Sequence, residues 1–167
     1  MAPKKIPVCF IDSCVFVDLL TDNKTVSKGD QEMPRGKLAE LLFTQVYNGR
    51  IVLASSPLVA AEVGCHPATD SVAIKVLKYL SDLLDHPSTR WTDIDRVLAR
   101  KSPELVNEWK SRAFNGKMGI NDALHLAAAI RLKADYFMTQ DEGFPIGHEV
   151  EGVQIEFARP IGQGDLF

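Results

Sequence analysis

The sequence predicts an α/β fold with a mainly parallel central sheet that is covered by helices on both faces. Short apolar runs rich in β-branched and aromatic residues alternate with longer segments whose apolar residues fall at helical spacing. Over a chain of 167 residues, this alternation is typical of a single three-layer domain. We expect one domain over residues 1–157, followed by a flexible C-terminal tail over residues 158–167.

The strands are predicted from short apolar runs. Residues 6–11 are expected to form a buried strand because they are apolar and contain β-branched and aromatic side chains. The same pattern predicts strands at residues 51–54, 136–139 and 153–157, and a short one around Arg90-Trp91. The polar stretch 21–35 contains Gly29 and Pro34, which predicts a loop.

The helices are predicted from apolar residues three and four positions apart, and they cover residues 15–20, 38–46, 57–63, 73–84, 94–98, 105–109 and 121–132. The pairs Ser56-Pro57 and Ser102-Pro103 each indicate a helix start, with a serine cap before a proline at the first helical position. The last helix is apolar almost all round, so we expect it at the centre of the fold.

The lengths of the apolar runs and the cysteine pattern predict a cytoplasmic protein without a membrane-spanning helix. Hydrophobic residues make up 46% of the chain, but no apolar run approaches the roughly 18 residues that a membrane span needs. Two lysines near the start are not followed by a long apolar stretch, which argues against a secretory signal. The three cysteines form no CxxC pair, which favours free thiols in a reducing cytoplasm. Cys65-His66 has no second pair to complete a zinc site, so we expect ordinary loop residues there.

A modestly basic segment interrupts an otherwise acidic chain. The net charge is −3, yet residues 90–117 carry seven Lys or Arg against four Asp or Glu. Such a segment is a candidate for contact with phosphate groups, and a solvated helix face is the simpler interpretation of the same charges. The candidate phosphate-binding residues are Arg96, Arg100, Lys101, Lys110 and Arg112.

Carboxylates occur where strands end and helices begin. Asp12 directly follows the first strand, Asp141 lies two residues past the strand ending near Thr139, and Asp122 opens the last helix. Glu62 lies about two turns into an apolar helix, where a carboxylate is rarely buried without a partner. Ligands of open parallel sheets bind outside the carboxyl ends of the strands. We therefore expect these acids to converge at that edge.

Each acid also has a simpler structural interpretation. Asp12 and Asp122 are common helix-cap residues, and Asp141 fits the turn over residues 140–143. Gathered together, however, the carboxylates would repel one another, and a divalent cation would remove that cost. Mg²⁺ and Mn²⁺ prefer oxygen ligands. The residues themselves leave both a metal site and a set of caps open.

Four segments resemble PIN domains, the nuclease family that includes VapC-type toxins. They are FIDSCVF at 10–16, SSPLVAAEV at 55–63, NDALHLAAA at 121–129 and DYFMTQDEGF at 135–144. The segments occur in the family's order and span most of the chain. By this resemblance the fold is a three-layer PIN-like fold, and Asp12, Glu62, Asp122 and Asp141 form an acidic cluster that binds Mg²⁺ or Mn²⁺.

The resemblance also implies roles for neighbouring polar residues. Thr139 matches the hydroxyl residue that often precedes the last acid, and Ser13 matches a small polar neighbour of the first acid. Both are expected to hold carboxylates in place. His125 lies one helical turn from Asp122, and we expect a core histidine bonded to backbone, with a position facing the site as the alternative.

The activity implied by the resemblance is that of a metal-dependent ribonuclease hydrolysing RNA phosphodiester bonds, with the toxin of a type II toxin–antitoxin pair as a candidate role. Such toxins are usually homodimers held by a small antitoxin, so RNA, an antitoxin and a second copy are the expected partners. A catalytically silent PIN-type module that binds RNA or a partner protein is the alternative. A cytosolic α/β protein whose acids only cap helices is a third interpretation.

The chain departs from the family pattern at two places. The loop at 21–35 and the extended tail after residue 157 make it somewhat longer than a typical VapC-type toxin. The last five residues, QGDLF at 163–167, resemble the short peptide by which bacterial proteins dock on the DNA sliding clamp, apart from Gly164. A tail without fixed structure is the simpler expectation.

Overall fold

The computed structural model describes residues 5–29, 32–67, 69–112 and 116–162. Its strands form one sheet in the order β3-β2-β1-β4-β6-β5, and every neighbouring pair is parallel except β5 with β6. The strands are β1 (Val8–Ile11), β2 (Val52–Ser55), β3 (Arg90–Trp91), β4 (Tyr136–Thr139), β5 (Glu149–Val150) and β6 (Val153–Phe157). The predicted mainly parallel α/β fold is therefore confirmed.

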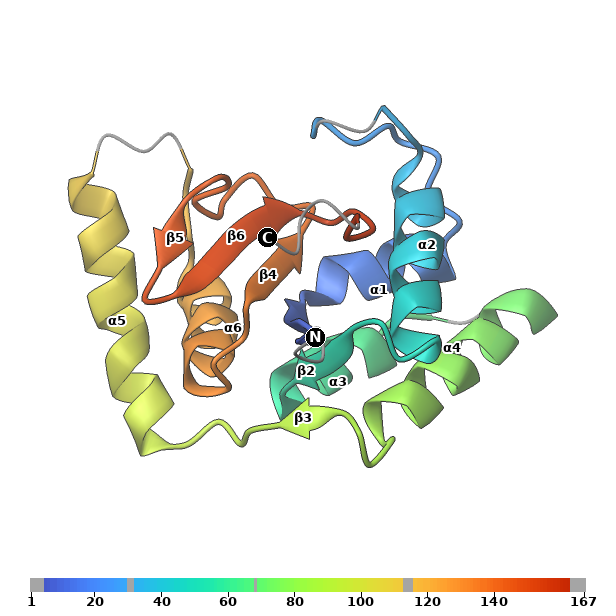
Figure 1. Ribbon diagram of the computed structural model, residues 1–167, viewed down its shortest axis with the longest axis horizontal. Helices are drawn as coiled ribbons and strands as arrows, with labels where there is room; N and C mark the ends of the chain where they lie inside the picture. The colour runs from blue at the N-terminus through green and yellow to red at the C-terminus, as the bar shows by residue number, and fades with distance from the viewer. Residues whose placement is uncertain (1–4, 30–31, 68, 113–115, 163–167) are drawn as a thin grey trace.

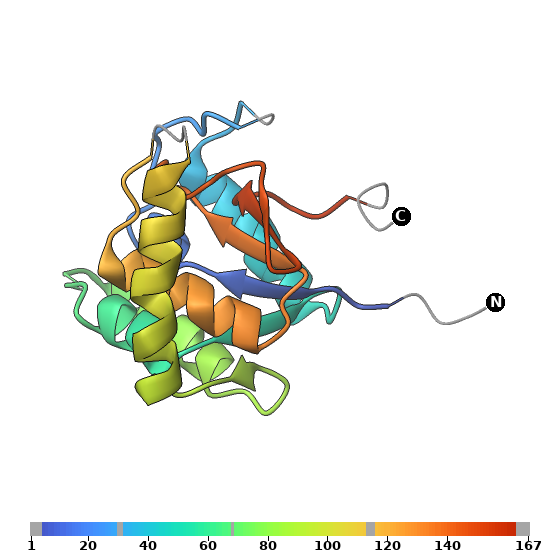
Figure 2. The same ribbon diagram turned by 90° about the vertical axis from the view of Figure 1, so that its left-hand side faces the viewer.

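The helices lie on the two sides of this sheet. They are α1 (Ser13–Leu20), α2 (Arg35–Tyr47), α3 (Pro57–Gly64), α4 (Ser71–Leu84), α5 (Arg96–Ser111) and α6 (Ile120–Arg131). Figure 1 shows α5 and α6 together on the left and α1, α2 and α4 together on the right, with the strands between them. Figure 2, turned by 90°, shows α5 running in front of α6, against which it packs.

The core is built on the central strands because β1 is buried along its whole length. Phe10 of β1 stacks on Phe137 of β4 at 5.5 Å between ring centroids, and Phe137 also meets Phe144 at 4.7 Å. On the helical side, Phe16 of α1 meets Phe43 of α2 edge to face at 4.7 Å. These aromatic contacts help to hold β1 beside β4. The residues at the carboxyl ends of the two strands therefore lie close together.

Residues 94–109 depart from the sequence prediction. Two short helices were expected there, at residues 94–98 and 105–109, with the second starting at Ser102-Pro103, but α5 is one helix. It is capped by Asp95, whose carboxylate accepts hydrogen bonds from Val97 and Leu98 amides, and Pro103 lies inside it. The buried residues share one side of the helix on both sides of Pro103, namely Leu98, Ser102, Leu105 and Trp109. Packing of this continuous face outweighs the local preference of proline.

Helix starts also differ in detail from the prediction. Ser56 occupies the cap position of α3, as expected, but its hydroxyl is buried and makes no hydrogen bond among the described residues. The last helix starts at Ile120, with Gly119 as its cap, rather than at Asn121. The two-residue strand β5, which pairs antiparallel with β6, was not predicted.

The chain beyond the last strand is partly described. Ala158 and Ile161 are buried, and the Ile161 amide donates to Oε1 of Gln45 on α2 at 2.8 Å. Residues 163–167, which carry the sequence resembling a clamp-binding peptide, lie outside the described residues. Among the helices that are described, none combines the length and apolar character needed to cross a membrane.

Candidate active site

Asp12 lies at the centre of the candidate site, at the carboxyl end of β1. Its amide donates to the Met138 carbonyl of β4 at 2.9 Å, and its carboxylate caps α1 by accepting from the Ser13 amide at 2.8 Å. Only 4% of the residue is exposed. Asp12 is therefore both a helix cap, as one interpretation expected, and a buried acid at the edge where the other interpretation put a metal.

Side chains from both neighbouring elements donate to the second carboxylate oxygen of Asp12. The Thr139 hydroxyl at the end of β4 donates to Oδ2 at 2.7 Å, and the Cys14 thiol of α1 donates to it at 3.2 Å. Thr139 and Asp12 are 127 positions apart in the chain and meet because β1 and β4 are adjacent parallel strands. The structure thus brings together the first acid and the predicted hydroxyl residue.

Burial dominates the electrostatics of Asp12. It raises the pKa of the carboxyl above its ordinary value, while the nearby His125 and the hydrogen bonds from Thr139, Cys14 and Ser13 act in the opposite direction. No Lys or Arg forms an ion pair with Asp12 in the part of the chain that the structure describes. An ionised Asp12 is therefore a buried negative charge that faces the His125 imidazole and has no Lys or Arg partner among the described residues.

Asp141 is tied to the same group of residues through Thr139. Its amide donates to the Thr139 hydroxyl oxygen at 3.0 Å, while its own Oδ1 accepts from the Gly143 amide at 2.7 Å. A Cβ atom at Gly143 would lie 3.1 Å from Oδ1, so glycine leaves room for this close turn. Asp141 is exposed, and its Oδ2 accepts no hydrogen bond from the described residues.

Glu62 and His125 form a pair across two helices. Nε2 of His125 on α6 lies 3.0 Å from Oε2 of Glu62 on α3. The imidazole is buried, whereas the Glu62 side chain is 33% exposed. The expectation of a histidine bonded to backbone was wrong, because its hydrogen-bond partner is a carboxylate 63 positions away. Nδ1 of His125 is buried and has no hydrogen-bond partner among the described residues.

Asp122 lies in the first turn of α6 and bonds to the cap residue Gly119. Its Oδ2 accepts from the Gly119 amide at 2.7 Å, so the side chain is folded back on the start of its own helix. Asp122 and His125 are one turn apart on α6, and His125 also packs against the ring of Phe10, with 6.1 Å between ring centroids. The start of α6 thus approaches both Glu62 and β1.

The oxygen donors present suit a hard divalent cation, although the acids are not gathered around one point. Among the described residues, no group of three or more His, Cys, Asp or Glu side chains is arranged to hold a metal ion. Asp122 and Asp141 each use one oxygen on a main-chain amide and have the other oxygen without such a bond. Carboxylate oxygens are the ligands that Mg²⁺ and Mn²⁺ prefer. The four-carboxylate metal site therefore stays a prediction.

The predicted phosphate-binding residues of α5 and of its C-cap, Arg112, fall into two groups. Lys101 pairs with Glu151 of the β5–β6 turn, and Arg112 pairs with Glu108 while lying over the Trp109 ring. The remaining three are exposed and form no ion pair within the described residues: Arg96, Arg100 and Lys110. They lie on the side of α5 opposite its buried face.

Two residues around Asp12 were missed by sequence reasoning. The sequence indicates Cys14 only as one of three free thiols, but its position two residues after Asp12 is a signal for contact with that acid. Gln140 is 4% exposed; its Oε1 accepts from Ser27 at 3.1 Å and its Nε2 donates to the Ala158 carbonyl at 3.2 Å. Gln140 therefore links the loop after β4 to the loop at 21–35 by a side-chain hydrogen bond.

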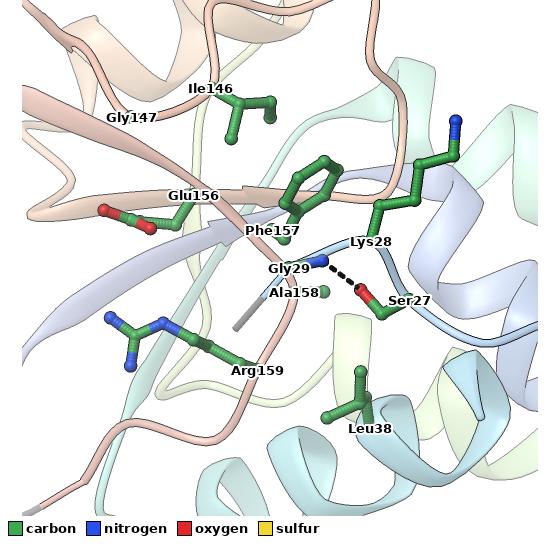
Figure 3. A pocket seen from close by; sticks show the side chains of 10 residues that line it. All are labelled: Ser27, Lys28, Gly29, Leu38, Ile146, Gly147, Glu156, Phe157, Ala158 and Arg159. Carbon is green, nitrogen blue, oxygen red and sulfur yellow. Dashed lines mark hydrogen bonds between the residues drawn. The ribbon is translucent and has the colours of Figure 1, made fainter. Parts of the chain in front are cut away.

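A pocket of about 260 Å³ lies away from these acids (Figure 3). Its walls come from the loop around Ser27 and Gly29, from Leu38 of α2 and from Glu156–Arg159 at the end of β6. In Figure 3 the ring of Phe157 stands beside Gly29, where a Cβ atom would approach that side chain to 3.1 Å. None of the predicted acids lines this pocket.

The raised pKa of Asp12 predicts how stability depends on pH in the metal-free protein. A carboxyl whose pKa is higher in the folded state than its ordinary value of 3.8 stabilises the fold fully below that value. This contribution is lost as the pH rises through the folded-state pKa. Relative to Asp12→Asn, the wild type is therefore expected to lose stability as the pH rises from about 4 towards neutrality.

Urea unfolding with EDTA, measured for both proteins across this pH range, tests the expectation. In the difference in unfolding free energy between the two proteins, the contributions of the titratable groups that they share cancel. A difference that is constant with pH, or that favours the wild type more at neutral pH, would contradict the buried, unpaired state of Asp12.

Comparison with known proteins identifies the family. The PIN domain family model matches residues 9–146. VapBC2 from Rickettsia felis bound to a DNA fragment from their promoter is similar in structure, at 15% identity and a TM-score of 0.56, covering 90% of this chain and 98% of that chain. FitAcB from Neisseria gonorrhoeae is similar at 15% identity and a TM-score of 0.52, with 89% and 96% covered. No curated protein matches the chain. Because the family model spans most of the sequence and all four acids, the chain belongs to the PIN domain family.

Proposed function

We propose that this PIN domain is a metal-dependent ribonuclease that hydrolyses RNA phosphodiester bonds with Mg²⁺ or Mn²⁺. The observation that carries the proposal is the buried carboxylate of Asp12, which pairs with no Lys or Arg of the described chain and lies against the loop of Asp141. A divalent cation would offset the cost of this buried charge. The ligands would be Asp12, Glu62, Asp122 and Asp141.

The chemistry needs an activated water and a stabilised leaving oxygen, and a bound divalent cation supplies both. The protein's own residues would hold the groups in place. Thr139 fixes Asp12 through its hydroxyl and Ser13 fixes it through its amide. Glu62, oriented by His125, is either a ligand or the group that orients the attacking water.

Substrate contact is proposed for the basic residues of α5. Arg96, Arg100 and Lys110 are exposed and free of ion pairs within the described residues, so binding phosphates would break no existing pair. Lys101 and Arg112 already neutralise acidic side chains, so each would have to exchange a carboxylate for a phosphate. The three unpaired cations are therefore the stronger phosphate candidates.

The partners proposed are a small antitoxin and a second copy of the chain, in a type II toxin–antitoxin pair. The support is the similarity of fold to VapBC2 and to FitAcB, of which the former was solved with a DNA fragment from their promoter. A cytoplasmic location is part of the same proposal, and it is supported by the free thiols of Cys9, Cys14 and Cys65.

A catalytically silent module that binds RNA or a partner protein is the second candidate. It is favoured by the way in which Asp12, Asp122 and Asp141 each accept a hydrogen bond from a nearby main-chain amide, as purely structural caps do. Metal binding without cleavage of any RNA would support this candidate over the nuclease.

Cleavage of a panel of single-stranded and structured RNAs tests the nuclease directly. Wild type is expected to cleave with Mn²⁺ and not with EDTA. Asp12→Asn and Asp141→Asn are expected to lower kcat by more than about 100-fold, the upper range for residues that only support metal ligands. Asp82→Asn is the matched control, because Asp82 is an exposed acid of α4 paired with Lys78. Equal cleavage by wild type and Asp12→Asn would refute the assignment.

Salt dependence of RNA binding tests the role of α5. Each phosphate contact to single-stranded RNA contributes about −0.7 to the slope of log K against log salt concentration. Replacing Arg96, Arg100 and Lys110 together by alanine is expected to flatten the slope by up to about 2, measured with EDTA to prevent cleavage. Lys78→Ala on α4 serves as the control cation. A slope that is unchanged in the triple variant would exclude this face from the RNA contact.

A further inference from the structure

One oxygen of the Asp12 carboxylate receives two side-chain donors of different kinds. The hydroxyl of Thr139 lies 2.7 Å from Oδ2, and the thiol of Cys14 lies 3.2 Å from the same atom. The other oxygen, Oδ1, accepts from the Ser13 amide at 2.8 Å. Cys14 is thus in direct contact with the acid on which the proposed activity depends.

Each of these two donors is itself held by a main-chain amide of the loop after β4. The Gln140 amide donates to Sγ of Cys14 at 3.3 Å, and the Asp141 amide donates to Oγ1 of Thr139 at 3.0 Å. Two chains of hydrogen bonds therefore run from successive amides to Oδ2 of Asp12, one through the thiol and one through the hydroxyl. The thiol and the hydroxyl also lie 3.4 Å apart. The Gln140 side chain is fixed by Ser27 and Ala158, which keeps the first amide in place.

The hydrogen bonds made by the described residues leave one acceptor position of Asp12 open. An ionised carboxylate has about four acceptor positions, two on each oxygen. Thr139 and Cys14 fill both positions on Oδ2, and the Ser13 amide fills one on Oδ1. The unfilled position is on Oδ1. Loss of the thiol would leave one acceptor position open on Oδ2 as well, and the carboxylate would then be held at Oδ2 by Thr139 alone.

We propose that Cys14 is a positioning residue that, together with Thr139, occupies Oδ2 of Asp12 and reserves Oδ1 for a divalent cation. The proposal deepens the proposed function and rests on it. Cys14 acts through Asp12 and does not itself contact the cation or the RNA. Loss of the Cys14 thiol is therefore expected to lower the affinity of the site for the cation.

The test compares Mn²⁺ binding, without RNA, across variants of Cys14 that separate hydrogen bonding from packing. Cys14→Val fills the space of the thiol but cannot donate, Cys14→Ala removes both, and Cys14→Ser keeps a donor and an acceptor. The Mn²⁺ dissociation constant is read from the electron paramagnetic resonance of free Mn²⁺. Cys65→Ala is the control, because Cys65 is exposed at the end of α3.

Valine and alanine are expected to weaken Mn²⁺ binding about 10–100-fold, the range for residues that orient metal ligands, while serine stays close to wild type. Urea unfolding with EDTA accompanies each variant. Weaker binding by Cys14→Val that Cys14→Ser restores, at equal metal-free stability, supports the proposal. Unchanged binding in Cys14→Val, or a loss shared by Cys14→Ser, overturns it.

The same experiment separates this proposal from the proposed function. Wild type that binds no Mn²⁺ overturns the metal site and the role of Cys14 together. Wild type that binds Mn²⁺ equally with all three Cys14 variants overturns only the role of Cys14 and leaves the nuclease proposal standing.

Discussion

The rest of the site depends on one constraint, the burial of the Asp12 carboxylate at the carboxyl end of β1. A buried carboxylate without a cation is costly, and here three donors, from Ser13, Cys14 and Thr139, offset only part of that cost. Burial still raises the pKa of Asp12 overall. A fold that keeps such a residue gives up stability, and binding a cation at this position would restore it.

The sheet topology explains why this constraint involves so many distant residues. Because β1 lies between β2 and β4 in a parallel sheet, Asp12, Thr139 and the start of α3 emerge at one edge. The loop after β4 then supplies amides to Thr139 and Cys14, and Gln140 connects this loop to Ser27. The hydrogen bonds at Asp12 thus connect α1 with β4, and Gln140 extends the network to the loop at 21–35.

Sequence pattern was enough for the parts of the fold that depend on local periodicity. It predicted β4 and β6 with their observed bounds, and it placed Asp12 and the loop of Asp141 at the edge where parallel strands end. The contact between Thr139 and Asp12 was expected from the family resemblance instead. It failed at α5, where a buried face that continues past Pro103 overrides a local breaker. It also missed the pairs Glu62–His125 and Cys14–Gln140, 63 and 126 positions apart, which depend on helix packing that periodicity does not specify.

Thermal unfolding with and without Mn²⁺, for wild type and Asp12→Asn, tests the central claim most directly. A cation that binds only the folded protein at 100 times its dissociation constant adds about 2.7 kcal/mol. For a domain of this size, each kcal/mol corresponds to a rise of about 2–4 °C in Tm. The account predicts such a rise for wild type and none for Asp12→Asn. No rise in wild type at millimolar Mn²⁺, or an equal rise in both proteins, would contradict it.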